Sequence, residues 1–347
     1  MRAKRILSWL FLVMVLGAVL SACGDDDSGG ESAPTESTES TAADGGGGAS
    51  DTIAVGMALP GPINDKGFNE AGYLGLQAIE AGGAEISYIE NVQAADQVEA
   101  LRNLAGQGLD LVIAHGGQFT DAAVQVAGEF PDVNFAVFNG TETAPNLSDY
   151  FIRYGTGSYL AGALAATISE SGVVGFVGGA EIPPTLQSQE GFEAGAKHVD
   201  PDVEVLSTVV GDFNDAPRAK EAALAQIADG ADVLYAFVDA GLPGVTEAAK
   251  GADHSVHMIG YIVPHCDADD IFVADAIFDS VTLYKQIGDA VKDGSWKGGE
   301  QVFTGLENPD VVSVQFCGDR VDADTQALIE DLGQQIVDGS LEIPEGL

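Results

Sequence analysis

The sequence predicts an α/β fold made of two lobes, each with a parallel sheet covered by helices. From residue 51 onward, short apolar runs alternate with amphipathic helical stretches. The runs are continuous rather than alternating, which is typical of strands buried on both faces. The same order of elements then recurs in a second half of similar size, without a repeat of the sequence itself. This rhythm predicts two α/β units, each with a parallel sheet covered on both faces.

The apolar runs and the periodic stretches between them locate the elements of both halves. In the first half we expect strands at 52–59, 85–89, 110–114 and 134–138, and helices at 69–82, 94–107 and 121–130. The rhythm resumes after 150–154, with strands at 173–177, 203–210, 233–237 and 257–261 and helices at 158–169, 188–198, 217–229 and 244–250. Helices at 280–292 and 324–338 end the chain.

A leader precedes these elements. It has a basic start and an apolar run at 6–19, which is too short to span a bilayer comfortably and is typical of a secretory signal. The stretch Leu-Ser-Ala-Cys at 20–23 resembles a bacterial lipobox, in which the cysteine is lipidated and becomes the mature N-terminus. We therefore expect a signal peptide at 1–22, a lipid on Cys23, and a protein anchored at the extracytoplasmic face of the cell membrane.

A polar segment separates the anchor from the lobes. Residues 24–50 contain no aromatic and no large aliphatic side chain, so they cannot offset the entropy of ordering. We expect a disordered tether at 23–50. The first lobe is expected at 51–154 plus about 262–303, and the second at about 155–261 plus 304–347, with a hinge of several strands between them.

The charge of the chain excludes one class of partner. There are 54 acidic and 14 basic residues, with a net charge of −40. Such a field repels nucleic acid and anionic headgroups, so we expect no nucleic-acid partner and no membrane contact beyond the lipid. A neutral or cationic ligand is favoured.

Two cysteines remain once Cys23 is lipidated. In an oxidising exterior, Cys266 and Cys317 can pair, but a separation of 51 residues says nothing of their geometry. The sequence leaves open whether they form a disulfide or stay as separate thiols.

Motifs of metal binding and catalysis are missing from the sequence. The His, Cys and Asp residues at 254–267 fit no zinc spacing. Signatures such as G-x-S-x-G, H-E-x-x-H and the Walker A loop are absent. We therefore expect no metal, no cofactor and no enzyme activity.

The candidate ligand residues follow the strands, because α/β sheets bind ligands at the carboxyl ends of their strands. In the first half they are Asp65, Phe68, Asn69, Gly117 and Asn139. In the second half they are Phe213, Asp239 and Tyr261. Phe68 and Phe213 occupy analogous loops, so two aromatic faces from two lobes would sandwich a flat ring, with Asp and Asn side chains reading its polar edges.

The loop at 64–69, Asn-Asp-Lys-Gly-Phe-Asn, is similar to the D-x-[SG]-F-N signature of the basic membrane protein family. Further similar segments lie at 130–135, 159–162, 191–197, 230–233 and 336–344, and the resemblance spans roughly residues 53–345. Members of this family are lipid-anchored substrate-binding subunits of ABC importers, and several bind purine nucleosides.

The resemblance implies a type I periplasmic-binding-protein-like fold and a monomer that delivers its ligand to a permease with ATPase subunits. It also implies that Asp65, Phe68, Asn69 and Phe213 contact the base or the sugar. We therefore expect a purine nucleoside or nucleobase between the lobes.

Two departures from the family pattern leave the identity of the ligand undecided. Asn139 and Ile262 stand where nucleoside-binding members usually carry Asp, and the second of those carboxylates holds ribose hydroxyls. A bare purine base is therefore an alternative to a nucleoside. A second alternative is a receptor for another flat solute, flavin-like or amide-like. A third is a signalling lipoprotein with the same fold.

Overall fold

The computed structural model describes residues 52–65 and 67–344. The predicted signal peptide, the tether and the lipidation site at Cys23 lie outside the described residues. Within them, two six-stranded sheets form the fold, which confirms the predicted α/β class. No helix in this part of the chain is both long and apolar enough to cross a bilayer.

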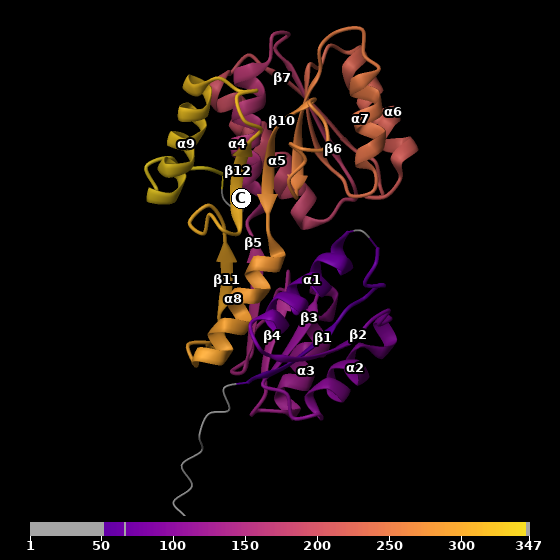
Figure 1. Ribbon diagram of the computed structural model, residues 1–347, viewed down its shortest axis with the longest axis vertical. Helices are drawn as coiled ribbons and strands as arrows, with labels where there is room; N and C mark the ends of the chain where they lie inside the picture. The colour runs from indigo at the N-terminus through magenta and orange to yellow at the C-terminus, as the bar shows by residue number, and fades with distance from the viewer. Residues whose placement is uncertain (1–51, 66, 345–347) are drawn as a thin grey trace, which may run out of the picture. The chain divides into compact units, whose positions relative to one another are not determined.

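The first sheet is parallel throughout. Its order is β11 (Gln301–Thr304), β5 (Leu147–Ile152), β4 (Asn134–Phe138), β3 (Leu111–His115), β1 (Ala54–Ala58) and β2 (Glu85–Ile89). On one face, α1 (Phe68–Ala81) and α8 (Ser280–Asp293) lie side by side (Figure 1). The other face is covered by α2 (Gln97–Ala105) and α3 (Thr120–Glu129), preceded by the short 3₁₀ helices η1 (Ala94–Asp96) and η2 (Gly117–Phe119). Burial on both faces explains the continuous apolar runs.

The second sheet is also parallel except at one edge, where β12 pairs antiparallel with its neighbour β10. Its order is β12 (Val312–Phe316), β10 (Phe272–Phe278), β9 (His257–Ile262), β8 (Val233–Phe237), β6 (Val173–Gly178) and β7 (Glu204–Val209). The helices on one face are α4 (Tyr154–Ile168), α5 (Pro183–Val199) and α9 (Ala323–Asp338). Those on the other are α6 (Ala216–Ala228) and α7 (Leu242–Lys250).

The chain passes between the two sheets three times, after β5, after β10 and after β11. These crossings form the expected hinge of several strands. The expected first-lobe range of about 262–303 is wrong at its start, because β10 pairs with β9 and β12 in the second sheet. The first-sheet part of this segment begins only with α8, which packs on α1.

Two glycine-containing segments set the packing of α4 against α5. A Cβ atom on Gly162 would lie 1.9 Å from the Phe192 carbonyl oxygen, and one on Gly195 would lie 1.8 Å from the Tyr159 carbonyl oxygen. Only glycine permits this approach of two helix backbones. The segments at 159–162 and 191–197 therefore set the close packing of these two helices.

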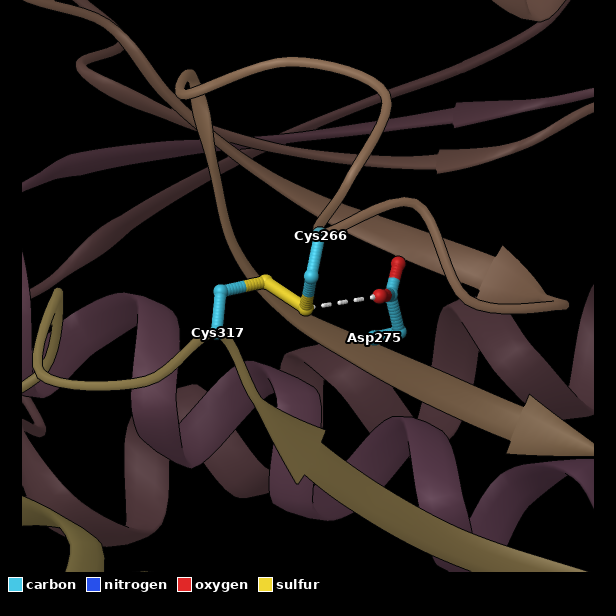
Figure 2. Close-up of side chains that lie close together, drawn as sticks. All are labelled: Cys266, Asp275 and Cys317. Atoms are coloured by element: carbon cyan, nitrogen blue, oxygen red, sulfur yellow. Dashed lines mark hydrogen bonds between the residues drawn. A yellow bond between two sulfur atoms is a disulfide. The ribbon is translucent and has the colours of Figure 1, made fainter.

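A disulfide joins Cys266, in the β9–β10 connection, to Cys317 at the end of β12 (Figure 2). The buried Asp275 of β10 lies beside it, with its Oδ2 atom 3.2 Å from the Cys266 sulfur. Asp275 accepts hydrogen bonds from the backbone amide and the ring Nδ1 of His265, at 2.8 and 3.0 Å. Because both sulfurs are in the disulfide, this group offers no thiolate ligands to a metal.

Candidate functional site

Loops from both sheets meet at the residues that follow β1 and β8. A Cβ atom on Gly67 would lie 3.1 Å from Asp239 Oδ2, although the two residues belong to different sheets. The same two sheets supply the other predicted site residues: Phe68 and Asn69 near β1, Gly117 after β3, Asn139 after β4, Phe213 after β7 and Tyr261 in β9. The strand-end rule therefore locates one region where both sheets contribute.

The Asp65 carboxylate organises the loop before α1. Its Oδ1 atom accepts hydrogen bonds from the amides of Gly67 and Glu70, both at 3.0 Å, and its Oδ2 atom accepts from the amide and side chain of Asn69 at 3.1 and 2.6 Å. Burial opposes the charge, but these hydrogen bonds outweigh it and lower the pKa of Asp65. The Asn69 oxygen accepts from the Gly61 amide at 2.9 Å. In this structure both side chains hold the loop in place.

Phe68 is half-exposed and rests on a buried histidine. Its ring stacks on His115 with a centroid distance of 3.9 Å and an interplanar angle of 25°. His115 Nε2 lies 2.7 Å from the Phe68 carbonyl oxygen, and Nδ1 lies 2.5 Å from the Tyr284 hydroxyl. Burial lowers the pKa of His115 to about 4. The hydrogen bond to the Phe68 carbonyl and the charge of Asp65 act in the opposite direction but are smaller effects. The neutral ring therefore donates a hydrogen bond from Nε2 to the Phe68 carbonyl oxygen and accepts one at Nδ1 from the Tyr284 hydroxyl.

The predicted aromatic partner, Phe213, is fixed on the second sheet. Its carbonyl oxygen accepts hydrogen bonds from the amides of Asp239 and Gly241 at 3.0 and 2.9 Å. Its ring covers Gly179, where an added Cβ would lie 2.2 Å from ring Cδ1. Phe213 and Asp239 are therefore held in a fixed relation to each other.

Asp239 is the least compensated carboxylate of this region. Burial first, and then the nearby Asp65 charge, raise the pKa of Asp239 to about 6. Its side chain makes no hydrogen bond or ion pair with any described residue. An acceptor placed in this way suits a ligand that brings hydrogen-bond donors or a positive charge.

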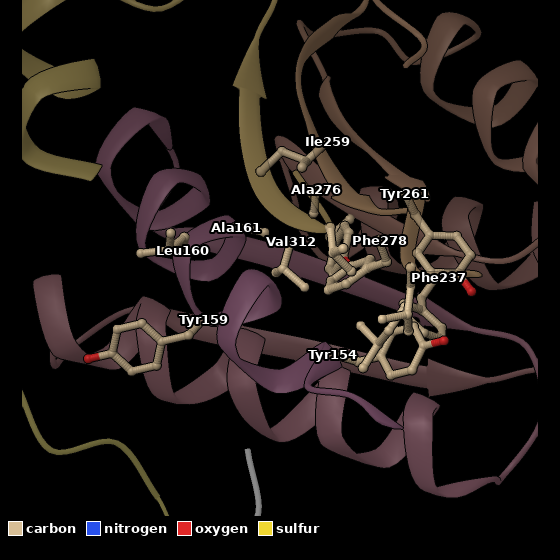
Figure 3. Packing of buried hydrophobic residues seen from close by; sticks show 14 of the residues in the cluster. Tyr154, Tyr159, Leu160, Ala161, Phe237, Ile259, Tyr261, Ala276, Phe278 and Val312 are labelled. Carbon is tan, nitrogen blue, oxygen red and sulfur yellow. The ribbon is translucent and has the colours of Figure 1, made fainter. Parts of the chain in front are cut away.

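Tyr154 and Tyr261 lie close enough to Asp239 for its charge to affect their pKa values. Figure 3 shows Tyr154, Phe237, Tyr261 and Phe278 gathered at one end of an aromatic cluster. The Tyr261 ring lies 3.9 Å from Phe237, and the Tyr154 ring lies 5.0 Å from Phe278. Burial raises the pKa of Tyr154 to about 12 and that of Tyr261 well above its usual value, and Asp239 adds to both shifts. Both hydroxyls are neutral donors.

Asn139 adds an acceptor from the first sheet. Its Oδ1 atom is buried and has no hydrogen-bond partner among the described residues, while its amide lies beside the Tyr154 hydroxyl. Its φ of +57° is tolerated by asparagine. A Cβ on Gly117 would lie 2.1 Å from the Asn139 carbonyl oxygen, so Gly117 permits close packing behind this residue.

Ile262, next to Tyr261, has a strained backbone with φ of +68°. A β-branched residue in this left-handed region costs on the order of 1–3 kcal/mol. The fold therefore imposes this turn on a side chain that does not favour it. Its side chain is apolar and offers no hydrogen bond.

The sequence missed His115 and Tyr154 as parts of this region. His115 contacts residues 47 and 169 positions away in the sequence, so no local pattern indicates its role. Tyr154 begins α4, directly after β5 and the first crossing between the sheets. Its position at the end of a strand could have identified it as a candidate site residue.

Comparison with known proteins gives the family. The family model described as "ABC transporter substrate-binding protein PnrA-like" matches residues 52–346. The chain is 28% identical to a purine-binding protein of Brucella abortus, over 84% of this chain and 83% of that one. It is 25% identical to the ABC transporter nucleoside-binding protein BmpA of Lactococcus lactis, over 98% and 99% of the two chains.

Solved structures agree with this result. An ABC transporter solute-binding protein from Conexibacter woesei matches with a TM-score of 0.70 and 27% identity, covering 85% of this chain and 99% of that one. The predicted resemblance to basic membrane proteins is confirmed, and with it a solute-binding rather than an enzymatic family activity. The chain belongs to the Bmp family of PnrA-like ABC transporter substrate-binding proteins.

Proposed function

We propose that this chain is the lipid-anchored solute-binding subunit of an ABC importer and that it binds a purine nucleoside or nucleobase between its two lobes. The observation that carries the proposal is the approach of Asp239, from the second sheet, to the Gly67 loop of the first. Phe68 directly follows Gly67, and the Phe213 carbonyl oxygen accepts a hydrogen bond from the Asp239 amide. The names of the Brucella purine-binding protein and the Lactococcus nucleoside-binding protein support a purine as the ligand class.

The ligand would stack on the aromatic rings and present its donors to the acceptors around it. Phe68 and Phe213 supply the faces, and each base–aromatic contact contributes about 1–3 kcal/mol. Asp239 and the buried Asn139 Oδ1 accept hydrogen bonds, while Tyr154 and Tyr261 donate them. Binding shifts the lobes toward closure by the ligand's differential affinity for the closed state.

The apolar Ile262 favours a bare base over a nucleoside. A ribose brings hydroxyls that need partners, and Ile262 has none to offer where related proteins carry a carboxylate. Asn139 likewise replaces a carboxylate with a neutral amide.

The anchor and the partners complete the proposal. A lipid on Cys23 and the tether at 23–50 would keep the lobes at the extracytoplasmic face, beside a permease driven by cytoplasmic ATPases. We further propose a monomer whose first lobe comprises 52–152 and 280–304 and whose second comprises 154–278 and 312–344.

Isothermal titration of the full chain with adenosine, guanosine, adenine and guanine tests the ligand class. We expect at least one purine to bind more tightly than about 100 µM, which corresponds to more than about 5 kcal/mol, and bases to bind more tightly than their nucleosides. Failure of all four purines, with tight binding of an unrelated solute such as riboflavin, would refute the purine assignment.

A further inference from the structure

We propose a second small-molecule site, at the hinge, that takes a zwitterionic α-amino acid with an apolar side chain. The site is a cavity of about 750 Å³ lined by residues of β5, β11, α4, α5 and α9, by the crossing segments that follow β5 and β11, and by the segment after α9. β5 and β11 lie side by side in the first sheet (Figure 1). None of its residues belongs to the purine region described above.

The first observation is a cation without an acceptor. Arg153 lines the cavity, and its guanidinium makes no hydrogen bond or ion pair in residues 52–65 and 67–344. Each other described lysine and arginine has a carboxylate or carbonyl partner. Arg153 instead lies over the exposed Phe303 ring, 5.5 Å from its centroid. In a chain with 54 acidic residues, an arginine left with all its donors free is available to an external carboxylate.

The second observation is a pair of acceptors in the same cavity. Glu307 accepts one hydrogen bond through Oε1, from the Gly305 amide at 2.7 Å, and forms no ion pair with a described residue. Gln187 also lines the cavity, and its Oε1 atom is buried without a donor in the part of the chain that the structure describes. A buried acceptor without a partner is costly to the fold and is explained by a donor supplied from outside.

The charges and the walls together define the ligand. Arg153 and Glu307 have opposite charges and share one cavity without pairing, so the complementary ligand has both charges and no net charge. An ammonium group has three donors for Glu307 and Gln187, and a carboxylate matches the guanidinium fork. The remaining wall includes Leu306, Ile336 and Val337, which suit an apolar side chain.

Titration of the full chain with L-leucine, 4-methylpentanoate and 3-methylbutylamine tests this site. The two analogues keep the leucine side chain but lack the ammonium or the carboxylate, respectively. We expect leucine to bind and each analogue to bind at least tenfold more weakly. Absence of leucine binding at millimolar concentration, or equal binding of either analogue, would overturn the proposal.

Variants then locate the binding. Arg153→Gln and Glu307→Gln should each weaken leucine binding at least tenfold, because each removes one charge partner. Arg102→Gln, which breaks the exposed pair with Glu129 elsewhere, should leave it unchanged, as should Phe213→Ala. Leucine binding that survives both hinge variants, or that is lost in Phe213→Ala, would refute the hinge site, and loss in Phe213→Ala would place leucine in the purine region. Titration of the same variants with a purine measures the affinity of the purine site independently of the hinge site.

Discussion

The carboxylates of Asp65 and Asp239 lie close together but have opposite effects on stability. Four hydrogen bonds lower the pKa of Asp65, so its contribution is present above its unfolded pKa and is lost as the pH falls through the folded value. Burial raises the pKa of Asp239 from 3.8 to about 6. The folded chain therefore binds more protons at Asp239 between these values, and its contribution becomes unfavourable as the pH rises through this window.

The substitution Asp239→Asn tests this assignment. It removes a charge that is costly only when ionised, so we expect the variant to gain stability over the parent above pH 6, by at most about 3 kcal/mol, with the gain vanishing near pH 4. Melting temperatures of both proteins from pH 4 to pH 8 measure the difference. A gain that does not change with pH, or one equalled by the substitution Asp121→Asn at an exposed position of α3, would contradict the account.

At the residue scale, the sequence predicted where the loops meet better than it predicted what each side chain does. Asp65 and Asn69 were expected to contact ligand, and the structure shows their polar atoms bonded within the loop. Hydrogen bonds of this kind depend on the folded turn, which composition and spacing do not reveal. Ligand contact by the eight candidate residues stays a prediction.

At the element scale, the approach of α4 to α5 governs the second lobe. Gly162→Ala places a Cβ atom 1.9 Å from a carbonyl oxygen of α5, so the helices must separate. We expect a loss of about 1–3 kcal/mol, seen as a lower melting temperature.

A matched helical glycine serves as the control. A Cβ on Gly128 of α3 has nothing within 4 Å, so Gly128→Ala should raise stability by about 0.5–1 kcal/mol. If Gly162→Ala melts at the parent temperature or above it, the tight α4–α5 packing is wrong.

The expected strands agree with the structure where a short segment rich in apolar residues marked a strand. The predicted strands at 85–89, 134–138 and 233–237 match β2, β4 and β8. The strands β5, β10, β11 and β12 were not predicted. β11 is short and has a polar residue at each end, and β10 contains the buried Asp275, so neither reads as an uninterrupted apolar run. This gap produced the wrong lobe boundary before α8.

At the scale of the whole molecule, three chain crossings connect the two sheets, and the contact between their loops can be tested directly. A Cβ on Gly67 lies 3.7 Å from the Asp239 Cβ, within the disulfide range of about 3.5–4.5 Å. In a Cys23→Ser background, Gly67→Cys with Asp239→Cys should cross-link under mild oxidation.

Peptide mass spectrometry after digestion detects the new bond beside the Cys266–Cys317 pair. The single Gly67→Cys variant should retain a free thiol and serves as the control. Two free thiols in the oxidised double variant would show that the loops of the two sheets do not meet.

The family was readable from the sequence because its motifs occur in order along nearly the whole chain, and the comparisons confirm it. The hinge cavity was not readable, since Arg153, Gln187 and Glu307 come together only through the crossings of the chain. Local patterns identify strands and loops, while a site assembled from distant segments requires the fold.

The most direct test of the central claim is a titration of the tightest-binding purine into Phe68→Ala and Phe213→Ala. If the ligand is held by both lobes, each variant loses about five- to 150-fold in affinity, because about 1–3 kcal/mol of stacking is removed. Tyr88→Ala, an exposed aromatic residue of β2, should bind as the parent does. An unchanged dissociation constant in either phenylalanine variant would contradict a ligand sandwiched between the two lobes.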